Sequence, residues 1–102
     1  MTDRLHNQVA IITGASRGIG RAIAEAYAAE GARLCLIATQ AAKLDEVAAA
    51  LGLGDDRLMT LGVDVRDRAA SVQAVRQVEQ HFGRVDVLVN NAGVYRAKPF
   101  LE

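Results

Sequence analysis

The chain has 102 residues, 51% of them hydrophobic and 24% charged, which is the composition of one small globular domain. Lysine and arginine (12) balance aspartate and glutamate (12), so nothing indicates the basic surface of a nucleic-acid or membrane-surface protein. No apolar run approaches the ~20 residues of a transmembrane helix, and the first residues lack a signal-peptide pattern. With Cys35 as the single cysteine, no internal disulfide can form. We expect a cytoplasmic protein with no nucleic-acid or membrane partner.

Strand-like and helix-like patterns alternate from the N-terminus onward. Val9–Thr13 is a short continuous apolar run, which predicts a strand buried on both faces. Apolar residues then recur at helical spacing, at Ile19, Ala22, Ile23, Ala26 and Tyr27. Gly31 is expected to end this helix. Leu34–Ile37 predicts a second buried strand, in which Cys35 fills the core.

The second half of the chain repeats this alternation. A second helix is predicted from Leu44, Val47, Ala48 and Leu51, with Gly52 closing it. Leu58–Asp64 is predicted to be the third strand. Asp67 is expected to cap a third helix that ends at Gly83, with an apolar stripe at Val72, Val75, Val78 and Phe82. Val85–Asn90 is predicted to be the fourth strand.

The predicted order is β-α-β-α-β-α-β, an α/β fold in which right-handed crossovers join the strands of one parallel sheet. We expect a single domain over residues 1–102 with the strands in the order third, second, first, fourth. The first two helices should cover one face of the sheet and the third helix the other.

Three glycines fall between the first strand and the first helix, with the spacing Gly14-x-x-x-Gly18-x-Gly20. A helix N-terminus has free backbone N–H groups and about +0.5 charge from the helix dipole, so it suits a phosphate. Glycines let such a ligand approach the backbone closely. The simpler interpretation is a turn that only joins a strand to a helix.

The string "TGASRGIG" (Thr13–Gly20) resembles the cofactor motif T-G-x-x-x-G-x-G of the short-chain dehydrogenases/reductases. "VDV" at Val63–Val65 and "NNAG" at Asn90–Gly93 resemble two further motifs of that family, in the same order. The resemblance covers nearly the whole chain and implies a Rossmann-type sheet that binds a nicotinamide dinucleotide.

The resemblance also implies roles for single residues. Backbone groups of residues 16–19 would line the diphosphate and the adenosine ribose. Asp64 would accept a hydrogen bond from the adenine amino group, and Asn90 would stabilise the sheet. The alternatives are a strand-end cap for Asp64 and a plain turn at residues 90–91. The expected cofactor-binding residues are Gly14, Ser16, Arg17, Gly18, Ile19, Gly20, Ala38, Thr39, Asp64, Val65, Asn90, Ala92 and Gly93.

The choice between NADP and NAD depends on the end of the second strand. NAD-binding sites usually carry an acid there for the ribose 2′-OH. Ala38 and Thr39 occupy that place, and the next acid, Asp45, lies in the second helix. Arg17 is available for a 2′-phosphate, although many NADP-preferring relatives have an arginine where this chain has Thr39. NADP is therefore predicted, with NAD as the alternative.

The catalytic residues that the resemblance would imply are missing. The family uses a Tyr-x-x-x-Lys pair, a serine and an asparagine, but neither Tyr27 nor Tyr95 has a lysine four residues later. His6, His81 and Cys35 form no metal-ligand spacing. We thus expect the coenzyme-binding half of an alcohol/carbonyl oxidoreductase, inactive by itself and binding the dinucleotide weakly. The alternatives are a non-enzymatic nucleotide-binding module and an assembly fragment that binds nothing.

The fourth strand would lie at an edge of the sheet. Val85–Asn90 has no proline, no lysine and a single acid, Asp86, so it lacks the usual protection against pairing with another strand. A homo-oligomer through this strand is predicted, with the last nine residues as the alternative cover for the edge.

Overall fold

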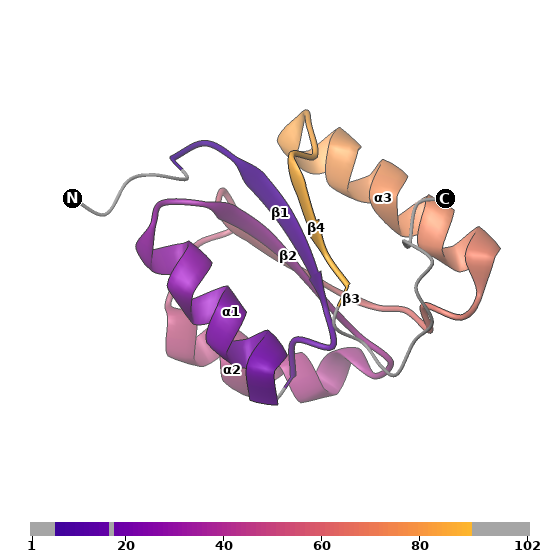
Figure 1. Cartoon of the computed structure of the whole chain (residues 1–102), viewed down its shortest axis with the longest axis horizontal. Helices are drawn as coiled ribbons and strands as arrows, with labels where there is room; N and C mark the ends of the chain where they lie inside the picture. The colour runs from indigo at the N-terminus through magenta and orange to yellow at the C-terminus, as the bar shows by residue number, and fades with distance from the viewer. Residues whose placement is uncertain (1–5, 17, 91–102) are drawn as a thin grey trace.

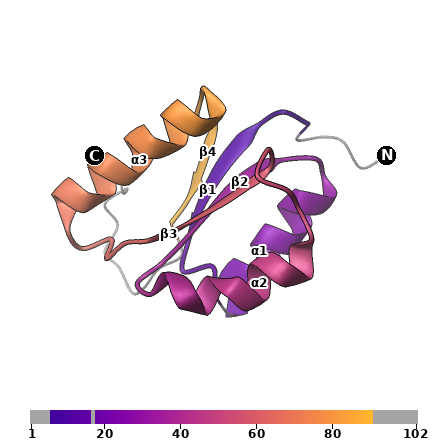
Figure 2. The ribbon, with the colours of Figure 1, turned by 180° about the vertical axis from the view of Figure 1, so that it is seen from behind.

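The structure, a computed structural model, describes residues 6–16 and 18–90. The elements follow one another as β1 (Val9–Thr13), α1 (Gly18–Ala29), β2 (Arg33–Ala38), the 3₁₀ helix η1 (Ala41–Leu44), α2 (Asp45–Leu51), β3 (Leu58–Gly62), α3 (Arg68–Phe82) and β4 (Val87–Val89). The strands form one parallel sheet in the order β3-β2-β1-β4, which confirms the predicted topology. Helices α1 and α2 lie on one face of the sheet and α3 lies on the other, as expected (Figures 1 and 2).

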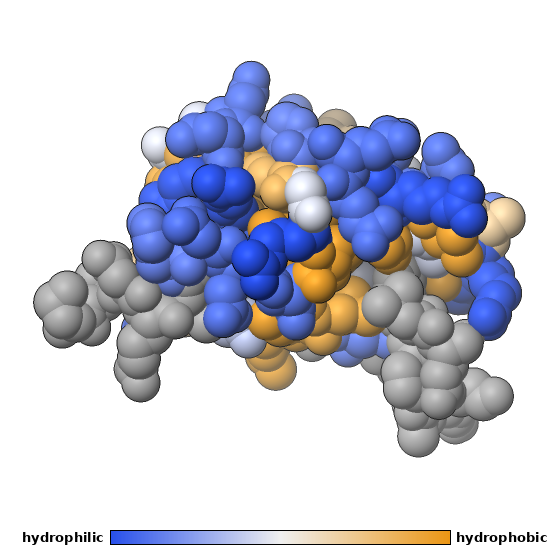
Figure 3. All heavy atoms as spheres, turned by 90° about the horizontal axis from the view of Figure 1, so that it is seen from above, coloured by the Kyte–Doolittle hydropathy of each residue, from blue (hydrophilic) through white to orange (hydrophobic). Residues whose placement is uncertain are grey.

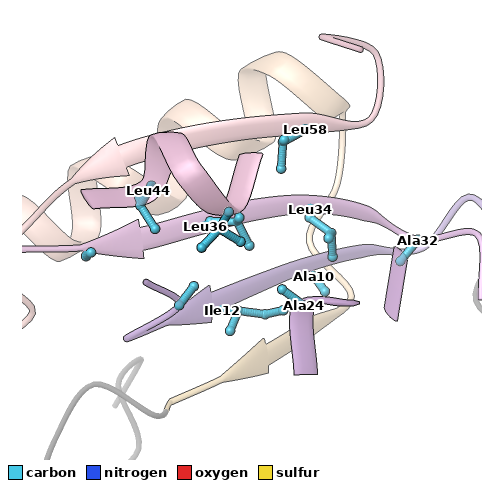
Figure 4. Close-up of a cluster of buried hydrophobic side chains, with 11 residues drawn as sticks. Ala10, Ile12, Ala24, Ala32, Leu34, Leu36, Leu44 and Leu58 are labelled. Atoms are coloured by element: carbon cyan, nitrogen blue, oxygen red, sulfur yellow. The ribbon is translucent and has the colours of Figure 1, made fainter. Parts of the chain in front are cut away.

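The two central strands explain why their sequences read as continuous apolar runs. All five residues of β1 and all but the first of β2 are buried, because both faces of these strands are covered. One core cluster faces α1 and α2 (Figure 4) and includes Ala10, Ile12, Ala24, Leu34, Leu36, Leu44 and Val47. The second faces α3 and is made of Val9, Ile11, Cys35, Ile37, Ala74, Val78 and Phe82. Cys35 fills the core, as predicted.

The predicted helix ends are confirmed. Asp67 precedes α3, and its Oδ1 accepts a hydrogen bond from the N–H of Ala70 at 3.0 Å, so it is the N-cap. Gly31, Gly52 and Gly83 each follow a helix and have a positive φ, which is the helix-ending conformation that favours glycine.

None of the described helices is long and apolar enough to cross a membrane.

Two strands are shorter than the sequence predicted. β3 ends at Gly62 rather than Asp64, because the chain turns there: the N–H of Asp67 donates to the carbonyl of Asp64 at 2.9 Å. β4 covers Val87–Val89 rather than residues 85–90. At its start, the carboxylate of Asp86 accepts a hydrogen bond from the N–H of Val9 at 2.9 Å, so a side chain takes the place of a ladder bond.

The buried stripes of two helices differ from the prediction. Ile19 is 70% exposed and Val72 is 43% exposed, and Ala22 and Ala26 are exposed as well. The predicted Val78 and Phe82 of α3 are buried, which confirms that part of the stripe. α1 instead buries Gly20 and Ala24, and α3 also buries Ser71 and Ala74. These four small residues let the helices approach the sheet closely. The prediction relied on large apolar side chains and was therefore wrong about which residues part of each helix buries.

Candidate functional site

The expected site residues that the structure describes lie at or just beyond the carboxyl ends of the strands. Because all four strands are parallel, the segments that follow them emerge at the same edge. The glycine loop follows β1, Thr39 follows β2, Asp64 follows β3 and Asn90 follows β4. In open α/β sheets, ligands bind at this end of the strands.

Glycines give the loop between β1 and α1 its backbone conformation. Gly14 (φ 64°) and Gly18 (φ 62°) both adopt left-handed backbone conformations that side chains disfavour. Gly18 is the first residue of α1, and a Cβ placed on it would have no heavy atom of the described residues within 4 Å. The side of Gly18 where a side chain would lie is therefore open within the described part of the chain, and phosphate binding by the helix N-terminus stays a prediction. Gly20 is buried and Ile19 is exposed.

The buried Thr13 joins the ends of β1 and β4. Its Oγ1 lies 3.3 Å from the carbonyl oxygen of Val89 and 3.2 Å from Oδ1 of Asn90. The hydroxyl thereby ties the strand that precedes the glycine loop to the strand that precedes the NNAG segment. Thr13 was not among the predicted site residues, although a single polar residue at the end of an apolar run was the available signal.

Asp64 is already engaged within the chain. Its Oδ1 accepts hydrogen bonds at 3.0 Å from both the backbone N–H and Nε of Arg66, and its Oδ2 accepts one at 3.0 Å from NH2 of Arg66. The side-chain hydrogen bond from Arg66, followed by the backbone one, holds the pKa of Asp64 below its ordinary value. The carboxylate is therefore an anion near neutral pH. These contacts fit the strand-end interpretation, and the adenine contact stays a prediction. The sequence analysis did not identify Arg66 as the partner of Asp64.

Val65 is half-buried and packs against the α3 side of the core.

The segment after β2 carries no acid before α2. Ala38 is buried at the end of the strand and Thr39 is exposed. The first carboxylate beyond them is Asp45, the first residue of α2. β3 holds this segment closely, since the N–H of Val63 donates to the carbonyl of Ala38 at 2.9 Å.

Some predicted residues lie outside the described part of the chain, namely Arg17, Ala92 and Gly93. Among the described residues, no three His, Cys, Asp or Glu side chains are grouped so that they could hold a metal ion. His81, in the last turn of α3, is exposed, with its Nε2 2.9 Å from the carbonyl oxygen of Asp55.

Comparison with known proteins adds the family. A model described as short chain dehydrogenase matches residues 8–102. The chain belongs to the short-chain dehydrogenase family. It is similar to D-threitol dehydrogenase of Mycolicibacterium smegmatis, with 47% identity over 97 residues, covering 94% of this chain and 37% of that protein.

Solved structures of short-chain dehydrogenases agree with this fold. A short-chain dehydrogenase/reductase (glucose/ribitol dehydrogenase) from Brucella melitensis matches with a TM-score of 0.85 and 40% identity, over 100% of this chain and 43% of that one. A 3-ketoacyl-(acyl-carrier-protein) reductase from the same organism, complexed with NADH, matches with a TM-score of 0.79 and 36% identity, over 88% of this chain and 36% of that one. The chain thus spans well under half the length of these relatives.

Proposed function

We propose that this chain is the coenzyme-binding half of a short-chain oxidoreductase and that it binds NADP through the adenosine part of the cofactor. The observation that carries the proposal is the glycine turn from β1 into α1, in which Gly14 and Gly18 have left-handed backbones and a Cβ on Gly18 would meet no described heavy atom within 4 Å. The longer protein would transfer hydride between NADP(H) and an alcohol or carbonyl substrate.

Each described segment has a part in holding the nucleotide. The first N–H groups of α1, next to Gly18, would bind the diphosphate. Thr39 would lie beside the adenosine ribose, and Asp64, with Val65 next to it, beside the adenine. Thr13 and Asn90 would keep the ends of β1 and β4 together under the nucleotide. The bound nicotinamide would supply the hydride chemistry.

Charge at the end of β2 supports NADP over NAD. A carboxylate about 4 Å from a phosphate repels it by ~1 kcal/mol per pair of unit charges in water and ~4 kcal/mol near a protein surface. Residues 38–44 contain no carboxylate that would repel a 2′-phosphate. Arg17 in the glycine loop would add an attraction. NAD is the alternative, since the similar reductase from Brucella melitensis was solved with NADH.

The proposal includes inactivity of the 102-residue chain alone. Neither tyrosine of the sequence has a lysine four residues later, so no residue pair is present to exchange the proton of an alcohol. The competing functions are a module that binds a nucleotide without catalysis and an assembly fragment that binds no nucleotide.

A cytoplasmic location also belongs to the proposal, because the single cysteine is a buried free thiol.

The experiment is a calorimetric titration of the chain with 2′,5′-ADP and with 5′-AMP, comparing Thr39→Asp with a control, Ala49→Asp. Both positions are exposed, and Ala49 lies in α2, away from the end of β2. The wild type should bind 2′,5′-ADP with a Kd on the order of 10 μM to 1 mM. Thr39→Asp should weaken that binding about tenfold and leave 5′-AMP unaffected or tighter, since ~1.4 kcal/mol of repulsion corresponds to a factor of ten.

Two results would contradict this function. If the wild type binds neither ligand at millimolar concentration, the nucleotide site is wrong. If it prefers 5′-AMP, the cofactor is NAD. NADPH oxidation with a panel of ketones and aldehydes should stay at the buffer rate, and turnover that depends on the protein would disprove the proposed inactivity.

A further inference from the structure

Asp64 and Arg66 form a closed pair just beyond the carboxyl end of β3. The backbone N–H and Nε of Arg66 donate to Oδ1 of Asp64, and NH2 of Arg66 donates to Oδ2, each at 3.0 Å. A guanidinium that binds both oxygens of a carboxylate fixes the geometry as well as the charge of the pair. The backbone N–H adds a third bond, so the carboxylate of Asp64 is held in one orientation.

The turn that carries this pair is itself held by α3. The N–H of Asp67 donates to the carbonyl of Asp64 at 2.9 Å, and the side chain of Asp67 caps α3 through the N–H of Ala70. The hydroxyl of the buried Ser71, one turn into α3, donates to the carbonyl of Val65 at 3.3 Å. The backbone on which the carboxylate stands is therefore fixed by the helix that follows it.

The pair leaves the carboxylate one acceptor position. An ionised carboxyl group accepts only, through about four lone-pair sites. Arg66 occupies two of these sites on Oδ1 and one on Oδ2, and no other described residue donates to the group. The site that remains is on Oδ2. Because the side chain of Asp64 is 42% exposed, a ligand can reach this carboxylate.

We propose that Arg66 is a positioning residue that, through Asp64, makes the nucleotide site selective for a 6-aminopurine over a 6-oxopurine. This rests on the proposed function, which places the adenine of the cofactor beside Asp64. Adenine carries an amino donor at position 6, which fits the remaining acceptor. Hypoxanthine has a carbonyl oxygen at position 6 and a donor N–H at position 1.

The fixed orientation is what lets Asp64 discriminate between these bases. A carboxylate that rotates freely could accept from the amino group of adenine or from the N1–H of hypoxanthine. With Arg66 on both oxygens, such a rotation breaks hydrogen bonds between charged groups, which are stronger than neutral ones. The oxopurine then meets an acceptor with an acceptor, and a site built to bind an N–H rejects a ligand that lacks it.

The experiment is a calorimetric titration of the chain with NADP and with its analogue in which hypoxanthine replaces adenine. The variants are Arg66→Gln, Arg66→Lys and the control Arg68→Gln. The side chain of Arg66 is 82% exposed and Arg68 is exposed as well, so these variants should fold. Seen from above, the molecule shows hydrophobic surface between hydrophilic regions (Figure 3), and polar replacements add no further exposed apolar group.

The ratio of the two affinities separates positioning from charge. The wild type should prefer NADP at least about tenfold, and both Arg66 variants should reduce this preference at least about threefold. Arg66→Lys keeps the positive charge and loses the two-pronged contact. Arg68→Gln removes the same charge two residues further along and should keep the preference. A change in charge alone affects both dinucleotides equally and cancels in the ratio.

Carbon NMR of the Asp64 carboxyl group gives a second readout that needs no ligand. The hydrogen bonds from Arg66 hold the pKa of Asp64 below its ordinary value, so this pKa should rise in Arg66→Gln and stay unchanged in Arg68→Gln.

Three results would overturn the role of Arg66 and leave the proposed function standing. They are equal binding of the two dinucleotides by the wild type, an undiminished preference in the folded Arg66 variants, and an unchanged pKa of Asp64 in Arg66→Gln. A wild type that binds neither dinucleotide overturns both.

Discussion

Gly62→Ala tests how β3 positions the segment that would hold the adenosine ribose. Gly62 is the last residue of β3 and lies opposite Ala38 of β2. A Cβ on Gly62 would lie 3.0 Å from the backbone nitrogen of Ala41 and 3.2 Å from its Cβ. Ala41 begins η1, directly after Thr39 and Gln40. The missing side chain at Gly62 therefore sets how closely this segment approaches the sheet.

The magnitude depends on two opposing effects. Replacing glycine by alanine restricts the unfolded chain and stabilises a protein by about 0.4–1 kcal/mol where the native backbone accepts it. A contact of 3.0 Å with backbone must instead be relieved by moving Ala41, and overpacking of this kind costs about 1–3 kcal/mol. Because a backbone atom cannot swing aside like a side chain, we expect the clash to prevail, with a net loss of about 1 kcal/mol. The displaced segment should also bind 2′,5′-ADP several-fold more weakly.

The assay is urea unfolding with a parallel calorimetric titration, and Gly54→Ala is the control. A Cβ on Gly54 would lie 3.0 Å from Oδ1 of Asp56, which is the movable end of a side chain. The control should be neutral or slightly stabilising and should bind nucleotide as the wild type does. If Gly62→Ala unfolds at the same urea midpoint as Gly54→Ala, the steric reasoning fails. If it is destabilised but binds 2′,5′-ADP normally, the ribose assignment fails while the packing argument stands.

Two further predictions concern titratable groups. The side-chain hydrogen bond from Arg84, followed by the N–H of Val9, holds the pKa of Asp86 below its ordinary value, so the stability it adds is present above about pH 4 and is lost as pH falls through the folded pKa. Urea midpoints at pH 7 and pH 3 should therefore differ more for the wild type than for Asp86→Asn, and equal differences would contradict the role of this carboxylate. Burial raises the pKa of the Cys35 thiol to about 12, so a thiol reagent at pH 8 should label the native chain only as fast as it opens, and urea should accelerate labelling. Rapid labelling of the native chain would show that the α3 side of the core is accessible.

The fold could be predicted from sequence because its signals are local and mutually consistent. Each buried strand is a continuous apolar run, and glycines stand at the ends of the helices. The side of each helix that is buried could be predicted only in part. Ile19 and Val72 are large and apolar yet exposed, whereas Gly20 and Ser71 are buried. A helix that packs close to the sheet needs small residues at the contact, and the spacing of large apolar residues does not reveal where they are needed.

The candidate site, too, could be predicted only in part. Sequence identified the segments that lie at the carboxyl end of the sheet, since strand order places them there. It did not identify the side-chain partners, because these depend on short-range geometry. The turn after β3 brings Arg66 onto Asp64, and the register of β1 with β4 brings Thr13 to Asn90. Neither contact has a spacing signature in the chain.

The short strand β4 connects the site to the edge of the sheet. Side chains secure it to β1 at both ends, through Asp86 on Val9 at its start and through Thr13 and Asn90 at its end. Only three backbone residues pair between these points. Asn90 follows directly on β4, so its position depends on a strand whose outer side has no neighbour among the described residues. Any strand that pairs with this outer side would therefore also restrain Asn90 and the adjoining side of the proposed nucleotide site.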